Sequence, residues 1–398
     1  MNLDIERLRA DTPGVADVLH FNNAGCALPV SAVTEAMVEY LRLEARIGGY
    51  EAQESMREAA ERPYSSLARL LNAAPDEIAV LENATRAWDM AFYAVRLQPG
   101  DRILTTRTEY CSNYIAFLQR ARRDRIEIDV APADANGDVD LDAFERLIGP
   151  RTRLIAITHV ATSGGLVNPA AAIGAIARRA GIPYLLDACQ SVGQIAIDVE
   201  AVGCDMLSGT ARKFLRGPRG IGFLYVRRSM LDSLEPPFLD DHAANWISDD
   251  TFEVRGDARR FETPECSVAA RIGFGVALDY ALALPFPEAE QRIRMLADRL
   301  RARLRGLPAT DVHDLGSHRC GIVTFSNAGV PAERMKAALA RRRMNVTVSA
   351  AEATRLDLVP RGIDRMVRAS VHYYNTVDEV DRFAEAVAVI TQPERITA

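Results

Sequence analysis

Three short apolar runs each end in residues with reactive or polar side chains: RLIAITHV (153–160), PYLLDACQ (183–190) and DMLSGTARK (205–213). Helix-like segments, with apolar residues every three or four positions, separate these runs. This alternation predicts an α/β fold with a mostly parallel seven-stranded sheet and helices on both faces; such sheets bind ligands at the carboxyl ends of their strands. The same pattern continues in four more runs: 77–83, 102–107, 126–132 and 221–226.

The pattern changes from about Asp279 onward. A long helical stretch (286–306) is followed by strands and helices in an order that suits a smaller α+β domain. We therefore expect a large domain over 21–270, and a small C-terminal domain formed by 271–398 together with 1–20.

The composition is that of a globular protein of two or three domains, with 398 residues, 48% hydrophobic and 26% charged. Arg, Asp or Gly interrupts every apolar stretch before it could span a bilayer, and the charged N-terminus has no apolar signal region. A net charge of −6 argues against a nucleic-acid binder. These features predict a cytoplasmic protein with no membrane or nucleic-acid partner.

The cysteines and histidines show no metal-binding spacing. There is no CxxC, HxxxH or HExxH motif, so we expect no metal site and six free thiols in a reducing compartment. A catalytic thiol is the alternative. The cysteines are Cys26, Cys111, Cys189, Cys204, Cys266 and Cys320.

Lysine is almost absent from the chain. Of the 48 basic residues only Lys213 and Lys336 are lysines. Arginine keeps its proton near neutral pH and cannot form a Schiff base, so a lysine retained here indicates that an amine is needed. Lys336 lies in an amphipathic helix, where a surface role explains it. Lys213 follows a predicted strand beside a turn rich in Gly and Pro, and we expect chemistry there.

Two segments at predicted strand ends could hold a phosphate and a charged ring. In ENATRAWDM (82–90), the backbone N–H groups of Ala84 and Thr85 at a helix N-terminus would bind a phosphate, although a helix cap explains the motif without any ligand. In LLDACQSVGQ (185–194), Asp187 ends a buried strand. A carboxylate there needs a cation, either a protonated pyridine nitrogen or a structural ion-pair partner.

Two further segments at predicted strand ends carry an aromatic ring and an amine. Tyr110, in TEYCSNY, offers an aromatic face for a flat ring, or is an ordinary half-buried tyrosine. Lys213 is flanked by Thr210 and Arg212. Together the four segments supply a phosphate cradle, a stacking ring, an acid for a ring nitrogen and an amine. Pyridoxal phosphate requires these groups.

With these motifs the sequence resembles the class V aminotransferase group of fold type I pyridoxal-phosphate enzymes. That group includes cysteine desulfurases, isopenicillin N epimerase-like proteins and C–S lyases. The resemblance runs from FNNAGCALP (21–29) to RASVHYYNTVDEVDRF (368–383), and is most specific between THVATSGGLVNP (158–169) and SGTARKFLRGPRGIGFLYV (208–226). It implies a fold type I architecture with a large cofactor-binding domain.

The resemblance assigns roles around the cofactor ring. Lys213 would form the Schiff base with pyridoxal phosphate, Asp187 would bind the pyridinium nitrogen, and Gln190 would touch the ring hydroxyl. Tyr110 would stack on the ring, where desulfurases usually have His. Thr162 falls beside the ring, where many relatives have Asn.

It also assigns roles at the phosphate and the substrate. Arg212 takes the place of a desulfurase His, and Ser267 would reach the phosphate of the partner subunit, which implies a homodimer. Arg368 would grip the substrate α-carboxylate in bidentate fashion, assisted by Asn23. The phosphate would be held by Ala84, Thr85, Thr210 and Arg212.

Two histidines keep open roles. On VRASVHYY the period of two places Arg368, Ser370 and His372 on one face, so His372 would contact the substrate or assist proton transfer, or serve as a structural histidine. His159 ends a predicted strand, and we favour an indirect role for it.

The expected reaction is C–S bond cleavage by β-elimination from a cysteine conjugate or its sulfoxide, giving pyruvate and ammonia. By resemblance, a persulfide-forming desulfurase carries a mobile thiol just before the carboxylate arginine. The corresponding stretch (346–370) has no cysteine, and Cys111 and Cys189 do not match that loop. An epimerase or an aminotransferase on the same scaffold is the alternative, and a cofactor-binding protein without turnover is a third.

Within the family, three segments resemble the hercynylcysteine sulfoxide lyases of ergothioneine biosynthesis. Specificity for the substrate side chain would lie in the loops 236–260 and 349–365, whose sequence does not identify it. The three segments are EARIGGYEAQ (44–53), RKFLRGPRGIG (212–222) and CSVAARIGFGVAL (266–278).

Overall fold

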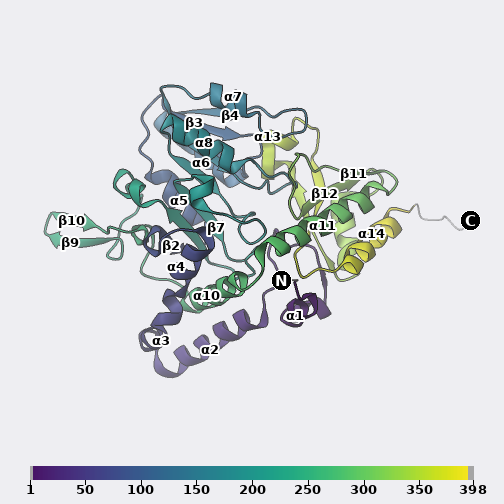
Figure 1. Cartoon of the computed structure of the whole chain (residues 1–398), viewed down its shortest axis with the longest axis horizontal. Helices are drawn as coiled ribbons and strands as arrows, with labels where there is room; N and C mark the ends of the chain where they lie inside the picture. Colours follow the sequence, from purple (N-terminus) through teal and green to yellow (C-terminus); the bar gives the residue numbers. More distant parts are fainter. Residues whose placement is uncertain (1–2, 393–398) are drawn as a thin grey trace, which may run out of the picture.

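The computed structural model describes residues 3–392, whose two main sheets have seven and four strands; two further strand pairs stand apart from them (Figure 1). The large sheet has seven strands in the order β2-β8-β7-β6-β5-β3-β4, and only β8 pairs antiparallel with its neighbours. The predicted mostly parallel seven-stranded sheet is confirmed. Its strands are β2 Ile78–Leu81, β3 Arg102–Thr106, β4 Glu127–Ala131, β5 Thr152–Thr158, β6 Tyr184–Asp187, β7 Met206–Thr210 and β8 Gly222–Val226.

Helices cover both faces of this sheet, because successive strand residues point to opposite sides. In β6, Tyr184 and Leu186 pack into one core cluster, and Leu185 packs into another on the opposite face. Helices α4, α8 and α10 contribute to the first cluster, and α5 and α6 to the second. These helices span α4 Arg57–Leu71, α5 Ala84–Ala94, α6 Cys111–Asp124, α8 Ala170–Ala180 and α10 Val268–Leu282.

The small domain is a four-stranded antiparallel sheet in the order β11-β12-β15-β14, packed against helices. Strand β1 (Leu19–His20) pairs with β13 (Met344–Asn345), so the N-terminal segment packs with this domain. Its other elements are α1 Ile5–Ala10, α11 Phe286–Arg305, β11 Thr310–Val312, β12 Ile322–Asn327, α12 Ala332–Ala340, β14 Thr347–Ala350, β15 Arg365–Ser370 and α14 Val377–Thr391.

The chain passes from the large to the small domain at the bend between α10 and α11, after the predicted boundary at residue 271. Ala270, Phe274 and Leu278 of α10 belong to the core of the large sheet, whereas α11 contributes Leu296 and Leu300 to the core of the small one. Helices α10 and α11 meet at an angle of 89°. The change of domain therefore falls between these two helices, and α10 belongs with the large domain.

Two parts of the chain project from the large domain in Figure 1: the helical pair α2 (Ser31–Ile47) and α3 (Gly49–Ser55), and the hairpin of β9 (Ala244–Ser248) and β10 (Thr251–Val254). The short helices α7 Leu141–Arg146, α9 Val199–Val202 and α13 Arg355–Leu358 complete the fold.

No single helix within residues 3–392 is long and apolar enough to cross a membrane. The bent pair of α10 and α11 passes that test jointly, by length and composition only. Much of α10 is buried in the protein, among residues of the large-domain core.

Candidate active site

One cavity opens beside the carboxyl ends of β5, β6 and β7. Nine of the ten cofactor residues expected from the sequence line it, the exception being Ser267. Its lining also includes residues that the sequence did not single out. The full set is Asn83, Ala84, Thr85, Trp88, Tyr110, Asn113, Thr158, Thr162, Asp187, Cys189, Gln190, Thr210, Arg212 and Lys213.

The start of helix α5 forms one wall of the cavity. The Asn83 side chain caps the helix by accepting from the backbone N–H of Arg86 at 2.9 Å, which leaves the N–H groups of Ala84 and Thr85 without helical acceptors. On β8, a Cβ at Gly222 would lie 2.5 Å from the Ala84 nitrogen. Glycine therefore lets the helix start sit directly on the sheet, where an anion can reach its N–H groups.

Asp187 lies buried at the end of β6, within a network of neutral donors. Its Oδ1 accepts from the backbone N–H of Cys189 and its Oδ2 from the Nδ2 of Asn113, both at 2.9 Å. Within residues 3–392 it forms no salt bridge. A buried carboxylate with no protein cation is costly, and a protonated ring nitrogen in the cavity is the partner it lacks.

Glu109 is a second buried carboxyl group, which the sequence analysis missed. It accepts from the backbone N–H groups of Tyr110 and Thr158 at 3.0 Å, and from Thr105 Oγ1 at 2.9 Å. Asn113 Nδ2 also donates to it, at 2.8 Å. Burial raises the pKa of Glu109 to about 7. The spacing of four residues between Glu109 and Asn113, one helical turn, was the available sequence signal.

Gln190 and Arg368 meet at Thr162. Gln190 Nε2 donates to Thr162 Oγ1 at 3.0 Å, and Arg368 Nη1 donates to the same hydroxyl at 3.1 Å and to the Thr162 carbonyl at 2.9 Å. Gln190 Oε1 and Arg368 Nε are buried without a hydrogen-bond partner among the described residues. An acceptor and a donor are thus left over beside the cavity, which suits a ring hydroxyl and a carboxylate respectively.

Lys213 and Tyr110 both line this cavity, although they come from distant parts of the sequence. Lys213 follows β7, and burial lowers the pKa of its amine below the ordinary value, which favours the neutral, nucleophilic form. Tyr110 precedes α6, and its backbone N–H donates to Glu109 and to Thr158 Oγ1. Its ring is placed by the same network that surrounds Asp187.

All three expected substrate residues lie outside the cavity lining: Arg368, which donates to the lining residue Thr162, and the residues Asn23 and His372. Asn23 Nδ2 donates to the Ser370 carbonyl at 2.7 Å, and its Oδ1 accepts from the Tyr374 hydroxyl at 2.5 Å. The ring of His372 accepts from the Tyr373 N–H and contacts the Phe214 carbonyl at 3.1 Å. Neighbouring groups of the protein use the hydrogen bonds that both side chains would offer to a substrate, so the structure gives them structural positions.

Ser267 and His159 also lie outside this cavity. Ser267 caps α10 by accepting from the Ala270 N–H at 3.3 Å, and lines a separate cavity with Tyr50 and Cys266. His159, just after β5, is buried with Nδ1 unpartnered among the described residues, and burial lowers its pKa to about 4. Its imidazole is neutral at physiological pH.

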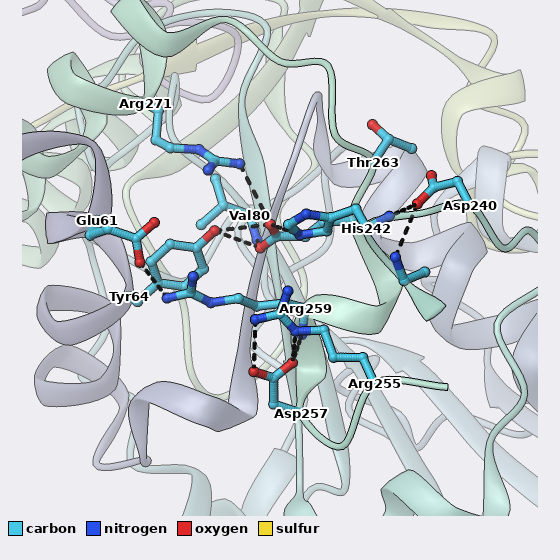
Figure 2. Close-up of polar contacts among 12 residues, drawn as sticks. Glu61, Tyr64, Val80, Asp240, His242, Arg255, Asp257, Arg259, Thr263 and Arg271 are labelled. Carbon is cyan, nitrogen blue, oxygen red and sulfur yellow. Dashed lines mark hydrogen bonds and ion pairs between the residues drawn. The ribbon is translucent and has the colours of Figure 1, made fainter. Parts of the chain in front are cut away.

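A second polar cluster, also missed by the sequence analysis, supports the segment that carries Ser267. Buried Glu262 accepts from the Tyr64 hydroxyl at 2.8 Å and from the Val80 N–H at 2.6 Å, with Arg271 at 3.5 Å. Figure 2 shows Tyr64, Arg271 and His242 converging on this point. The cluster links α4, β2 and α10.

Comparison with known proteins agrees with this architecture. The aminotransferase class-V family model matches residues 19–383. A probable cysteine desulfurase of Xylella fastidiosa (strain 9a5c) is 32% identical over 401 residues, covering 96% of this chain and 95% of the relative. A probable cysteine desulfurase of Methanothermobacter thermautotrophicus is 27% identical over 97% of this chain and 98% of the relative.

Solved structures show the same fold. The apo cysteine desulfurase of Thermococcus onnurineus NA1 superposes with a TM-score of 0.91 at 25% identity, covering 98% of both chains. The cysteine desulfurase CsdA of Escherichia coli gives a TM-score of 0.91 at 25% identity, covering 98% of this chain and 99% of the other. The protein is therefore a pyridoxal-phosphate-dependent enzyme of fold type I. It belongs to the aminotransferase class-V family.

The residues that line the cavity fit pyridoxal phosphate, independently of the comparisons. Asp187 lacks a cation, Gln190 Oε1 lacks a donor, and the N-terminus of α5 presents free N–H groups. Lys213 lines the same cavity, where its amine would bond the cofactor aldehyde. These features match, in order, the pyridinium nitrogen, the ring hydroxyl, the phosphate and the aldehyde of that cofactor.

Proposed function

We propose that the protein is a C–S lyase that cleaves a cysteine conjugate or its sulfoxide by β-elimination. For a conjugate R–S–CH₂–CH(NH₃⁺)–COO⁻, one water is consumed, and R–SH, pyruvate and ammonium are formed. With a sulfoxide the sulfur leaves as R–SOH. The resemblance to hercynylcysteine sulfoxide lyases supports the sulfoxide as one substrate type. The arrangement of Lys213 and Arg368 around a cavity with no family-type thiol is the observation that carries the proposal.

Each of three residues would have a different role in the reaction. Pyridoxal phosphate held by these residues would supply an electron sink for the charge that develops at the substrate Cα. Lys213 takes the Cα proton, and its lowered pKa favours the neutral amine needed for this. Arg368 holds the α-carboxylate through donors not used by Thr162. Asp187 holds the proton on the ring nitrogen, so that the negative charge left at Cα is stabilised.

Desulfuration needs a thiol that attacks the substrate sulfur, and the chain has none in the stretch where the resemblance would place it. Residues 346–370 contain no cysteine. Cys189 lines the cavity, but burial raises the pKa of its thiol well above the ordinary value, which disfavours the nucleophilic thiolate. Elimination, in which the sulfur leaves with its substituent, requires no protein thiol.

The test is a pyruvate and ammonia assay on the purified holoenzyme with S-substituted cysteines, their sulfoxides and free cysteine. We expect pyruvate from a conjugate and none from free cysteine. A shift of the cofactor absorbance to that of a pyridoxamine form, without pyruvate, would instead indicate transamination. Exchange of the Cα proton with solvent, without pyruvate, would indicate epimerisation. In Lys213→Ala, both turnover and the borohydride-reducible bond to the cofactor should vanish. A cofactor-binding protein without turnover would give no product with any substrate.

We also propose a homodimer in which Ser267 serves the phosphate site of the partner. Ser267 lies away from its own chain's cofactor cavity, in the cavity it shares with Tyr50. Tyr50 is 85% exposed and Leu41, on the same wall, is 52% exposed, which suits a surface covered by another chain. Light scattering of the holoenzyme tests this, with a monomer as the contradicting result.

A further inference from the structure

Two arginines face the active-site region without acidic partners. Within residues 3–392 neither Arg212 nor Arg368 forms a salt bridge, although most other arginines near carboxylates do. Arg368 donates only to Thr162 and leaves Nε unpartnered. Arg212 lines the cavity, and among the described residues its one side-chain hydrogen bond runs from Nη1 to the Gly25 carbonyl.

The two guanidinium groups lie close enough to affect one another. The positive charge of Arg212 adds to burial in lowering the pKa of Arg368, and it also acts on Cys26 beside Gly25. Asp187 is the one acid in the described lining, and Asn113 and Cys189 hold it at the end of β6. Like charges at close range are unfavourable unless an anion lies between or beside them.

Arg212 lines the cavity together with Ala84, Thr85 and Thr210, but among the described residues its side chain donates to the Gly25 carbonyl and to no group of α5. Its hydrogen bond to Gly25 directs the guanidinium toward the N-terminal loop, where the Ala24 carbonyl accepts from Gln190 at 3.2 Å. The phosphate can be met by N–H groups at the start of α5 and by Thr210. Arg212 is thus free to bind a different anion.

We propose that Arg212 recognises a second negative group on the substituent of the substrate sulfur. Arg368 takes the α-carboxylate, and Arg212 takes a carboxylate beyond the sulfur. The preferred substrates are then S-(carboxyalkyl)-type cysteine conjugates or their sulfoxides. The planar fork of arginine matches a carboxylate in bidentate fashion, and a lysine would not replace it. This substrate class rests on the proposed lyase function, but the anion preference can be measured without turnover.

The first experiment measures binding alone. Pimelate places two carboxylates at the spacing expected in S-(2-carboxyethyl)-cysteine, and heptanoate has the same chain with one. We expect the holoenzyme to bind pimelate more tightly in calorimetry. Arg212→Gln should reduce that advantage roughly tenfold, the usual cost of a lost hydrogen bond to a charged group. Arg219→Gln, at an exposed position whose charge also acts on Cys26, is the matched control and should keep the preference.

Equal binding of the two acids, or an equal loss in both variants, would overturn the proposal. Spectrophotometric titration with pyridoxal phosphate distinguishes the other role: a weakened affinity for the cofactor in Arg212→Gln with an unchanged acid preference would place Arg212 at the phosphate. Thermal unfolding of each variant verifies that the fold is intact.

The second experiment uses turnover. S-(2-carboxyethyl)-cysteine and S-(2-carbamoylethyl)-cysteine differ only in charge. We expect the wild-type enzyme to favour the first through KM, and Arg212→Gln to lose that discrimination. Pyruvate from both at equal KM would overturn the proposal and leave the lyase function standing. Pyruvate from neither would overturn the lyase function, while pimelate binding would still decide the role of Arg212.

Discussion

Asn113 donates a hydrogen bond of 2.9 Å from its side-chain amide to Oδ2 of Asp187. The same amide donates to Oε1 of Glu109 at 2.8 Å. Because this nitrogen only donates, both carboxyl groups must present an unprotonated oxygen to it. The bridge therefore fixes Asp187 with one oxygen ready to accept, which is the state that a protonated ring nitrogen requires.

Removing this bridge should impair chemistry more than binding. For Asn113→Ala we expect kcat to fall roughly 10- to 100-fold with a smaller change in KM, because a hydrogen bond to a charged group is worth about 1.5–3 kcal/mol. Steady-state pyruvate release measures both constants, and the absorbance spectrum of the bound cofactor shows whether the environment of its ring has changed. Gln119→Ala, on the exposed side of the same helix, is the control. Equal effects in both variants would contradict a positioning role for Asn113.

Glu109 should make stability depend on pH. Burial, with a further contribution from the charge of Asp187, raises the pKa of Glu109 from its ordinary 4.5 to about 7. The folded state thus favours the protonated form. Its contribution to stability is complete below the ordinary pKa, and is lost as the pH rises through about 7.

The expected loss is roughly 3 kcal/mol, since one pKa unit corresponds to about 1.4 kcal/mol. Urea unfolding of wild type and Glu109→Gln across this pH window measures it. The free energy of unfolding should fall with rising pH in the wild type, and should stay flatter in the variant, whose side chain cannot ionise. Parallel curves would contradict the assignment of this titration to Glu109.

Gly222 should be intolerant of a side chain. A Cβ at this position would lie 2.5 Å from the Ala84 nitrogen and from the Asn83 carbonyl carbon, so Gly222→Ala must push the start of α5 away from the sheet. We expect a loss of about 1–3 kcal/mol of stability, the usual cost of overpacking, together with weaker cofactor binding. Thermal unfolding and cofactor titration measure the two effects. Gly149→Ala, where a Cβ meets no atom within 4 Å, should change neither.

The strand-end residues that line the cavity could be singled out from the sequence because their positions follow from local pattern. A strand that ends in an acid, and one of only two lysines in a chain rich in arginine, can be recognised without knowing the tertiary structure. Glu109 and Asn113 could not be found that way. Their role arises only when the first turn of α6 meets the ends of β3, β5 and β6, which brings Thr105, Thr158 and Asp187 to them.

Asn23 and His372 lie outside the cavity lining for a related reason. The period of two was expected to place Arg368, Ser370 and His372 on one face, but β15 ends at Ser370, so that period no longer applies at His372. Asn23 belongs to a loop whose contacts with Ser370 and Tyr374 come from more than 300 residues away. We propose that α10 belongs with the large domain; the sequence could not show this, because α10 is apolar around much of its surface and helical periodicity alone does not show which core it joins.

Thr162 should control substrate affinity through its hydroxyl. In Thr162→Val the shape is kept, but Gln190 Nε2 and Arg368 Nη1 each lose one of two acceptors and keep only a backbone carbonyl, and a lost hydrogen bond to a charged group costs about 1.5–3 kcal/mol. Arg368 is then held only by the Thr162 carbonyl, so we expect KM for the amino-acid substrate to rise roughly tenfold, with a smaller change in kcat. Thr162→Ser keeps the hydroxyl and should restore KM to near the wild-type value. A serine variant as impaired as the valine variant would show that the methyl group matters instead, and that the hydroxyl does not position Arg368.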